Sequence, residues 1–233
     1  MTPEDILNLS IGTLLSSEDI KFIESIHNGD WITQHDECAK RLERLCETAA
    51  WLEKLALQLA RTKQRLAQKG LSVELSVSGG DAKFKQTTCK AVKDCLVSAY
   101  GIKPSASDIG AAYFAVLIRD HESSVVSAAL ADFRPFPDNE FSTRMEAVDK
   151  KWQGQKVATE LFLFIDSAVR FLTRADGFVR LNMMGCDPSS MVIKSYVDID
   201  APEWHSTMLE KFGFTEEDDS GWRGDVEFYK VLA

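Results

Sequence analysis

Met145-Glu-Ala-Val-Asp-Lys-Lys-Trp-Gln-Gly-Gln-Lys-Val-Ala-Thr-Glu-Leu161 is the stretch that decides the fold of this chain. It begins with a strand pattern, passes through a short polar loop that contains Gly154, and continues as an amphipathic helix from Val157. The first turn of such a helix has backbone N–H groups without intrahelical partners and carries the positive end of the helix dipole. A glycine beside that turn lets a ligand approach the backbone closely. The stretch therefore predicts a site for an anion such as a pyrophosphate.

The sequence around this stretch predicts a mixed α/β domain over residues 70–233. Runs of alternating or continuous apolar residues predict strands, and longer runs with helical spacing predict helices. In chain order we expect a strand at 71–77, a helix at about 82–100, strands at 112–118, 125–133 and 140–148, a helix at about 157–173, a strand at 192–198, a short helix at 202–212 and a strand at 226–231. Residues 119–122 are expected to form a hairpin turn, and residues 216–219 an exposed acidic loop. This order predicts a largely antiparallel mixed sheet flanked by helices.

Residues 1–69 predict an N-terminal helical extension. Ser16-Ser17-Glu18-Asp19 has the composition of a helix N-cap, and residues 35–69 contain neither glycine nor proline. Apolar residues recur there at alternating spacings of four and three, at Cys38, Leu42, Leu45, Ala49, Leu52, Ala56, Leu59 and Leu66. Such a seam on one long amphipathic helix fits a coiled coil or docking arm, which would bind a protein partner or a second copy through residues 38–66. It fits equally a helix that packs on its own domain, and both interpretations stay open.

Composition excludes several classes of protein. The formal net charge of −9 disfavours direct nucleic-acid binding and favours basic partners, such as a lysine-rich protein or a polyamine. The five cysteines form no C-x-x-C pair, so we expect neither a metal site nor a disulfide framework. The sequence contains no apolar run of the ~20 residues that a membrane-spanning helix needs. It also shows no signal-peptide pattern, and we expect an intracellular protein, cytoplasmic or nuclear.

Two motifs resemble the GNAT superfamily of N-acetyltransferases. The family's acetyl-coenzyme A signature is an apolar strand end, an aromatic residue and then Arg/Gln-x-x-Gly-x-Gly/Ala. It is matched here by Ala147-Val148, Trp152 and Gln153-Gly154-Gln155-Lys156-Val157-Ala158. The run Glu210-Lys211-Phe212-Gly213-Phe214 is similar to the family's Lys-x-Gly-Phe ending before the last strands. The order of predicted strands and helices matches the family over residues 70–233.

The resemblance implies acetyl-coenzyme A as cosubstrate and a set of residues that bind it. Those residues are Ala147, Val148, Gln153, Gly154, Gln155, Lys156, Val157 and Ala158. The loop backbone from Gln153 to Ala158 would hold the pyrophosphate. Glu146 and Val148 would offer backbone groups to the pantetheine arm, and the strand with Tyr196 and Asp198 would splay away to form the other wall of the acyl slot.

The chain departs from the family pattern at five positions, two of which are Pro202 and His205, where the family often has Asn and Ala. Lys156 replaces the first glycine of the motif, and it either pairs with a phosphate or blocks close approach. Leu209 stands where the family often has the tyrosine that protonates the leaving thiolate, and Ser142 where histone-type members have a base glutamate. The candidate catalytic residues are therefore Glu146, Tyr196 and His205, which carry groups that accept or donate protons near the expected slot.

Two hypotheses of function follow. The first is an N-acetyltransferase that transfers acetyl from acetyl-coenzyme A to an amine, for example a lysine of a basic protein. The second is a GNAT-fold scaffold or subunit with weakened catalysis that docks partners through its N-terminal helix. The intact loop from Trp152 to Ala158 favours the enzyme. Lys156, Leu209, Ser142 and the apolar seam favour the scaffold.

Overall fold

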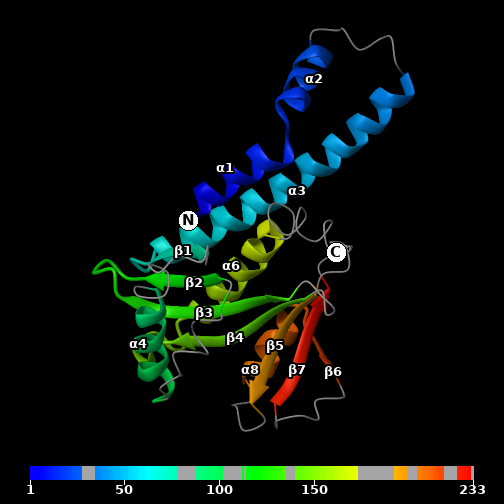
Figure 1. Ribbon diagram of the computed structural model, residues 1–233. Coiled ribbons are helices and arrows are strands. Elements are labelled where there is room, and N and C mark those ends of the chain that lie inside the picture. The colour runs from blue at the N-terminus through cyan, green and yellow to red at the C-terminus, as the bar shows by residue number, and fades with distance from the viewer. Residues whose placement is uncertain are drawn as a thin grey trace.

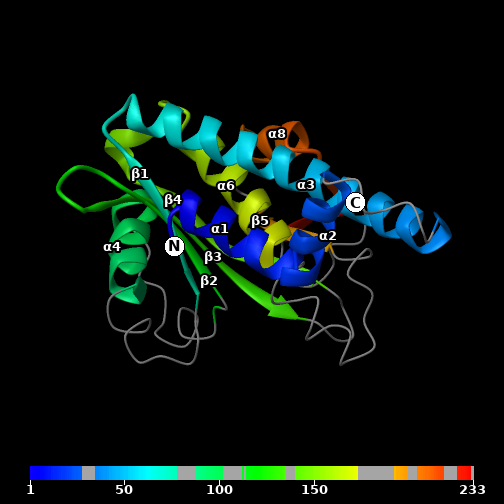
Figure 2. The same cartoon turned by 90° about the horizontal axis from the view of Figure 1, so that it is seen from above.

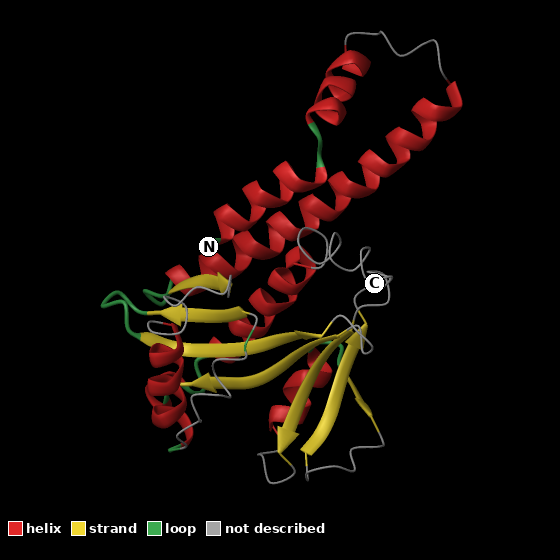
Figure 3. Cartoon of the chain, viewed as in Figure 1, coloured by secondary structure: helices red, strands yellow, loops and turns green. Residues whose placement is uncertain are grey.

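The computed structural model describes residues 1–27, 35–77, 88–101, 112, 114–134, 140–172, 192–198, 204–217 and 225–231. Its helices are α1 (Pro3–Leu14), α2 (Ser17–His27), α3 (His35–Ala67), α4 (Cys89–Tyr100), α6 (Val157–Leu172) and α8 (Trp204–Lys211), with a short 3₁₀ turn, η2 (Lys150–Trp152). Its strands are β1 (Ser72–Val77), β2 (Phe114–Arg119), β3 (Val125–Arg134), β4 (Glu140–Val148), β5 (Val192–Asp198), β6 (Thr215–Glu217) and β7 (Asp225–Val231). Figure 3 shows the strands as one continuous sheet.

The described strands form a seven-stranded sheet in the order β1-β2-β3-β4-β5-β7-β6. β1 to β4 pair antiparallel as a meander, whereas β4 and β5 run parallel because α6 connects them. β5 pairs antiparallel with β7, and β7 with β6. The mixed, largely antiparallel sheet predicted from the sequence is therefore confirmed.

Helices cover both faces of the sheet (Figure 2). Because side chains alternate along a strand, Phe114, Val116 and Ile118 of β2 pack with α1, α3 and α6, while Ala115 and Leu117 pack with α4 on the opposite face. All five side chains are fully buried. The sheet thus has two apolar cores, and a ligand that reaches its centre has to enter where two strands separate.

The long helix predicted from the apolar seam is α3, and its two halves have different neighbours (Figure 1). Its second half buries Leu55, Leu59 and Leu66 in the same core as α6 and the sheet. Gln58 Nε2 donates to the Leu163 carbonyl of α6 at 2.7 Å. Its first half extends beyond the sheet with α2 beside it. The second half of α3 therefore packs on α6 and the sheet, whereas the first half contacts α2.

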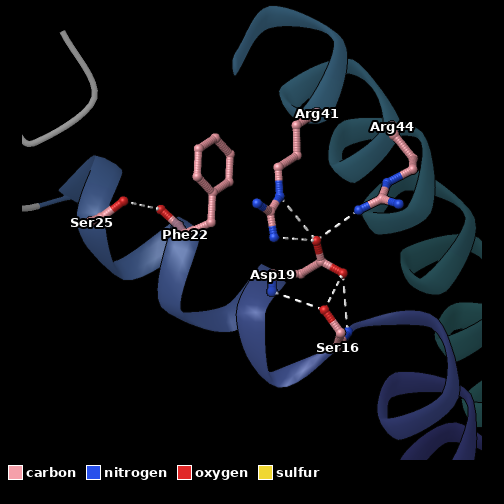
Figure 4. Close-up of polar contacts among 6 residues, drawn as sticks. All are labelled: Ser16, Asp19, Phe22, Ser25, Arg41 and Arg44. Carbon is pink, nitrogen blue, oxygen red and sulfur yellow. Dashed lines mark hydrogen bonds and ion pairs between the residues drawn. The ribbon is translucent and has the colours of Figure 1, made fainter. Parts of the chain in front are cut away.

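A polar cluster joins α2 to the first half of α3 (Figure 4). Asp19 and Ser16 form a reciprocal N-cap: Ser16 Oγ accepts from the Asp19 N–H at 3.0 Å, and Asp19 Oδ2 accepts from the Ser16 N–H at 3.1 Å. The other Asp19 oxygen accepts from Arg41 at 3.0 Å and from Arg44 at 2.7 Å. The Arg41 guanidinium also lies 4.6 Å from the centre of the Phe22 ring. The helix start predicted at Ser16 is confirmed.

Most predicted element bounds agree with the structure. The strands predicted at 140–148 and 192–198 coincide with β4 and β5, and Asp120 and Ser123 form the predicted turn between β2 and β3. The helix predicted from residue 82 is described from Cys89, and residues 78–87 lie outside the described residues. The acidic loop predicted at 216–219 is wrong for its first two residues, because Glu216 and Glu217 pair with β7 as strand β6. Both remain exposed.

Candidate active site

The sheet opens between β4 and β5. The two strands pair only from Glu140 to Thr143 of β4 and from Val192 to Ser195 of β5. Beyond these residues β4 continues to Val148 along β3, while β5 continues to Asp198 along β7. Figure 1 shows the two strands diverging from their paired ends. Divergence leaves the second half of β4 with an edge that β5 does not cover.

The loop from β4 to α6 has the backbone that a glycine-rich phosphate loop requires. Gly154 has φ of +76° and Lys156 has φ of +61°, both in the left-handed region. Asp149 caps the η2 turn by accepting from the Lys151 N–H at 2.9 Å. α6 then begins at Val157, and its first turn carries unpaired N–H groups and the positive end of the dipole. Lys156 therefore adopts a left-handed conformation, which glycine adopts with less strain.

A cavity of about 470 Å³ joins this loop to the open edge of β4. It is lined by Tyr100, Glu146, Ala147, Val148, Trp152, Gln153, Gly154, Lys156, Val157, Ala158, Leu161, Phe162, His205 and Met208. α4 lies on one face of the sheet, and α6 and α8 lie on the other. The cavity therefore reaches from one face to the other beside the divergent strands. Its lining is mostly apolar, with a few polar groups, as in sites for small molecules.

The structure brings together most of the residues that the sequence proposes for the coenzyme. Of the eight, seven line the cavity; Gln155 does not, and its side-chain amide donates to the Lys151 carbonyl at 2.9 Å. Gln153 donates to the Val148 carbonyl at 3.0 Å. Lys156 lines the cavity and is exposed to solvent.

The candidate catalytic residues meet this cavity to different extents. Glu146 lines it, and one carboxylate oxygen accepts from Ser195 Oγ of β5 at 3.2 Å, across the opening between the strands. His205 lines it from the first turn of α8 and is half-buried. Tyr196 pairs through its backbone with Glu227 of β7, and its side chain lies outside the described residues. Glu146 and His205 thus face one space.

Sequence reasoning missed Tyr100. This last residue of α4 lines the cavity, and its hydroxyl donates to the Glu146 carbonyl at 2.9 Å. Partial burial of Tyr100, which is still 48% exposed, raises the pKa of the phenol above its ordinary value, and the nearby Glu146 charge raises it further, so the hydroxyl stays protonated at neutral pH. Gly101 ends α4 directly afterwards, with φ of +73° and its N–H donating to Val97. That helix-ending glycine is the one sequence signal that marks Tyr100's position.

The two departures from the family pattern at catalytic positions are buried. Leu209 is 0% exposed in the core, and Ser142 is 1% exposed on β4. Gly213, with φ of +80°, ends α8, and the Phe214 N–H donates to the Leu209 carbonyl at 3.1 Å. Leu209 therefore helps to anchor α8 rather than meeting a ligand.

Among the residues that the structure describes, no three His, Cys, Asp or Glu side chains gather as metal ligands would. No helix in this described part of the chain is both long and apolar enough to cross a membrane.

Several solved structures are similar to this chain. The ribosomal-protein-S18-alanine N-acetyltransferase from Escherichia coli is 13% identical, with 69% of this chain and 94% of that chain covered and a TM-score of 0.47. The GNAT family N-acetyltransferase YhbS from Escherichia coli, in complex with CoA, is 15% identical, with 70% and 82% covered and a TM-score of 0.44. A GNAT family acetyltransferase from Staphylococcus aureus Mu50 is 12% identical, with 70% and 100% covered and a TM-score of 0.44.

No protein-family profile matches the sequence, and no curated protein matches it either. The identities and TM-scores of these matches are too low to indicate an activity for this chain. The fold is established by its own features: the strand order, the parallel β4–β5 pair that diverges, and the loop before α6. These features agree with the mixed sheet and loop that the resemblance of its sequence to the GNAT superfamily implies.

Proposed function

We propose that this chain is an N-acetyltransferase that transfers acetyl from acetyl-coenzyme A to an amine. The observation that carries the proposal is the cavity that joins the first turn of α6 to the open edge of β4. The N–H groups of that turn suit a pyrophosphate, and Gly154 leaves the backbone accessible. An extended arm with amide groups can then follow β4 toward Glu146. Such an arm brings its thioester to the place where β4 and β5 separate.

Glu146 is the proposed base. Glu146 lines the cavity, and its carboxylate accepts a hydrogen bond from Ser195. It would take a proton from the acceptor ammonium, directly or through water, so that the free amine attacks the thioester carbonyl. The C–N bond forms, the C–S bond breaks, and the thiolate takes a proton from a donor. Tyr196 and His205 are the candidate donors, His205 because it lines the same cavity.

The proposed acceptor is basic, such as a lysine of a basic protein or a polyamine. Glu210, Glu216 and Glu217 are exposed on α8 and β6, and the whole chain has a formal net charge of −9. Acidic groups of this kind raise the local concentration of cations. Screening basic peptides and polyamines, with release of the free thiol as readout, identifies the acceptor.

Calorimetric titration with acetyl-coenzyme A tests the site. Micromolar binding by the unchanged chain is expected. Gly154→Glu should abolish that binding by placing a carboxylate against the pyrophosphate. Gly154→Gln has nearly the same shape and the same backbone strain without the charge, so it should retain much more affinity. Absence of binding by the unchanged chain, or equal affinities of the two variants, contradicts this placement of the coenzyme.

Glu146→Gln tests the proposed base. General bases contribute roughly 10²- to 10⁴-fold to rate. We expect kcat to fall within this range while the dissociation constant of acetyl-coenzyme A changes little. His205→Ala and Tyr196→Phe, measured in parallel, assign the proton donor. A Glu146→Gln enzyme with full kcat would show that another group is the base.

One observation favours the second candidate, a GNAT-fold scaffold. Leu209, which occupies the family's tyrosine position, is fully buried and offers no proton. In that case acetyl-coenzyme A binds without turnover on any amine, and the first half of α3 provides the docking surface. Turnover on one amine is enough to decide for the enzyme.

A further inference from the structure

Two side chains occupy acceptors on the open edge of β4. Tyr100 Oη donates to the Glu146 carbonyl at 2.9 Å, and Gln153 Nε2 donates to the Val148 carbonyl at 3.0 Å. Both carbonyls lie beyond Thr143, the last residue of β4 that pairs with β5. Tyr100 comes from α4 and Gln153 from the loop before α6, so the two donors come from separate elements. All four residues line the cavity.

These two carbonyls lie on the edge of β4 that β5 does not cover. Carbonyls two residues apart on a strand point to the same side. The carbonyls of Glu146 and Val148 can therefore accept hydrogen bonds from the same neighbouring chain. An open strand edge binds extended chains through their amide groups. The pantetheine arm of the proposed coenzyme is extended and contains two amides. Its N–H groups would therefore meet acceptors that Tyr100 and Gln153 already use.

Both donors are free to leave without cost to the interior. Tyr100 is 48% exposed, and Gln153 is also exposed. When either side chain rotates away, water solvates its polar end, and no buried donor is left without a partner. The side chains that hold the core around them, such as Val92 and Ala99 of α4, do not have to move.

We propose that Tyr100 and Gln153 determine the affinity of the site: they cap the Glu146 and Val148 carbonyls in the free protein and release them to the pantetheine amides when acetyl-coenzyme A binds. This inference rests on the proposed function, which supplies the ligand. Each cap competes with the coenzyme for one acceptor. Removal of a cap should therefore strengthen binding, the opposite of what removal of a ligand contact does.

The test measures the dissociation constant of acetyl-coenzyme A for Tyr100→Phe, Gln153→Ala and the double variant. One neutral hydrogen bond corresponds to about 0.5–1.5 kcal/mol, so each single change should lower the constant about 2- to 12-fold. The double variant should combine the two factors. Tyr229→Phe on β7 and Gln64→Ala on α3 are matched controls outside the cavity lining, and they should leave the constant unchanged.

A coenzyme fragment separates this inference from the proposed function. Adenosine 3′-phosphate 5′-diphosphate contains the pyrophosphate but no pantetheine, so Tyr100→Phe should not change its affinity. If the unchanged chain binds acetyl-coenzyme A and Tyr100→Phe binds it equally or more weakly, the cap inference is overturned and the proposed function stands. If no form of the chain binds the coenzyme or the fragment, both are overturned. Tighter binding of the coenzyme alone supports both.

Discussion

Lys156 shows how one residue can depart from a motif and still keep its backbone. Its φ of +61° lies in the left-handed region, where the conformational free energy of a residue other than glycine is about 1–2 kcal/mol less favourable. Neighbouring contacts hold it there: the Glu160 N–H donates to its carbonyl at 3.3 Å, and Gly154 makes the turn before it. Of the two interpretations that the sequence leaves open, an exposed lysine that lines the cavity favours pairing with a phosphate.

The strain at Lys156 predicts that Lys156→Gly stabilises the folded chain. Relief of the left-handed strain should raise the free energy of unfolding by about 1 kcal/mol, with part of the gain lost to glycine's freedom in the unfolded chain. Urea denaturation of the free protein measures this. Lys156→Ala removes the same ammonium but keeps the strain, so it should show no gain. Equal midpoints for the two variants would mean that the surroundings, not φ, set the cost.

The sequence predicts where the candidate coenzyme residues lie, but it does not predict where Tyr100 lies. Residues from Ala147 to Ala158 form one local strand–loop–helix unit, so their types and spacing predict their common place. Tyr100 lies 46 residues away from Glu146 in the sequence. Packing of α4 across the sheet brings it to the cavity, and its partner is a backbone carbonyl, which leaves no mark on residue type. Contacts of this kind appear only once the fold is known.

At the scale of elements, Asp19 has two roles, of which the sequence predicted one. The Ser16–Asp19 spacing indicates a capped helix start because cap partners are three residues apart. The ion pairs of Asp19 with Arg41 and Arg44 depend on how α2 lies against α3, and no local spacing records this. The first half of α3 therefore holds α2 through one carboxylate that is 5% exposed.

Because the Asp19 carboxylate holds α2 against α3, we expect this attachment to weaken at acidic pH. Hydrogen bonds from Ser16, and then the pairs with Arg41 and Arg44, lower the pKa of Asp19 from 3.8 to about 2. A lowered folded-state pKa contributes stability that is present above about pH 4 and lost as the pH falls toward 2. Amide hydrogen exchange should show α2 losing protection over this interval.

A charge-removing variant separates this link from general acid effects. Asp19→Asn should show the loss of protection in α2 already at neutral pH. Glu18→Gln removes the neighbouring charge, which is exposed, and should leave α2 protected. Acetyl-coenzyme A binding should be the same in both variants, because residues of α2 do not line the cavity. Full protection of α2 in Asp19→Asn would assign its attachment to the apolar contacts instead.

At the scale of the whole molecule, α3 links the extension to the sheet. Leu55, Leu59 and Leu66 belong to the same core as α6, and Arg65 pairs with the buried Glu160 of α6 at 2.5 Å. The apolar seam predicted the helix and part of its buried stripe: Leu45, Leu59 and Leu66 are buried, whereas Ala49 is exposed. The seam could not identify the packing partner, because an apolar face indicates that it is covered but does not indicate which element covers it. The covering surface is supplied by residues more than 90 positions later, such as Leu161 and Phe164 of α6.

Shared packing predicts that the second half of α3 unfolds together with the sheet, although residue 69 is the boundary that composition predicts. Leu59 is 2% exposed, and Leu59→Ala should lower the free energy of unfolding of the whole chain by about 2–5 kcal/mol. Leu57→Ala removes the same atoms two positions earlier, where the side chain is 50% exposed, and should change it by less than about 0.5 kcal/mol. Tryptophan fluorescence and circular dichroism in urea should then give coincident transitions for sheet and helix. Two separate transitions, with Leu59→Ala moving only the helical one, would instead make residues 1–69 a unit that unfolds independently of the sheet.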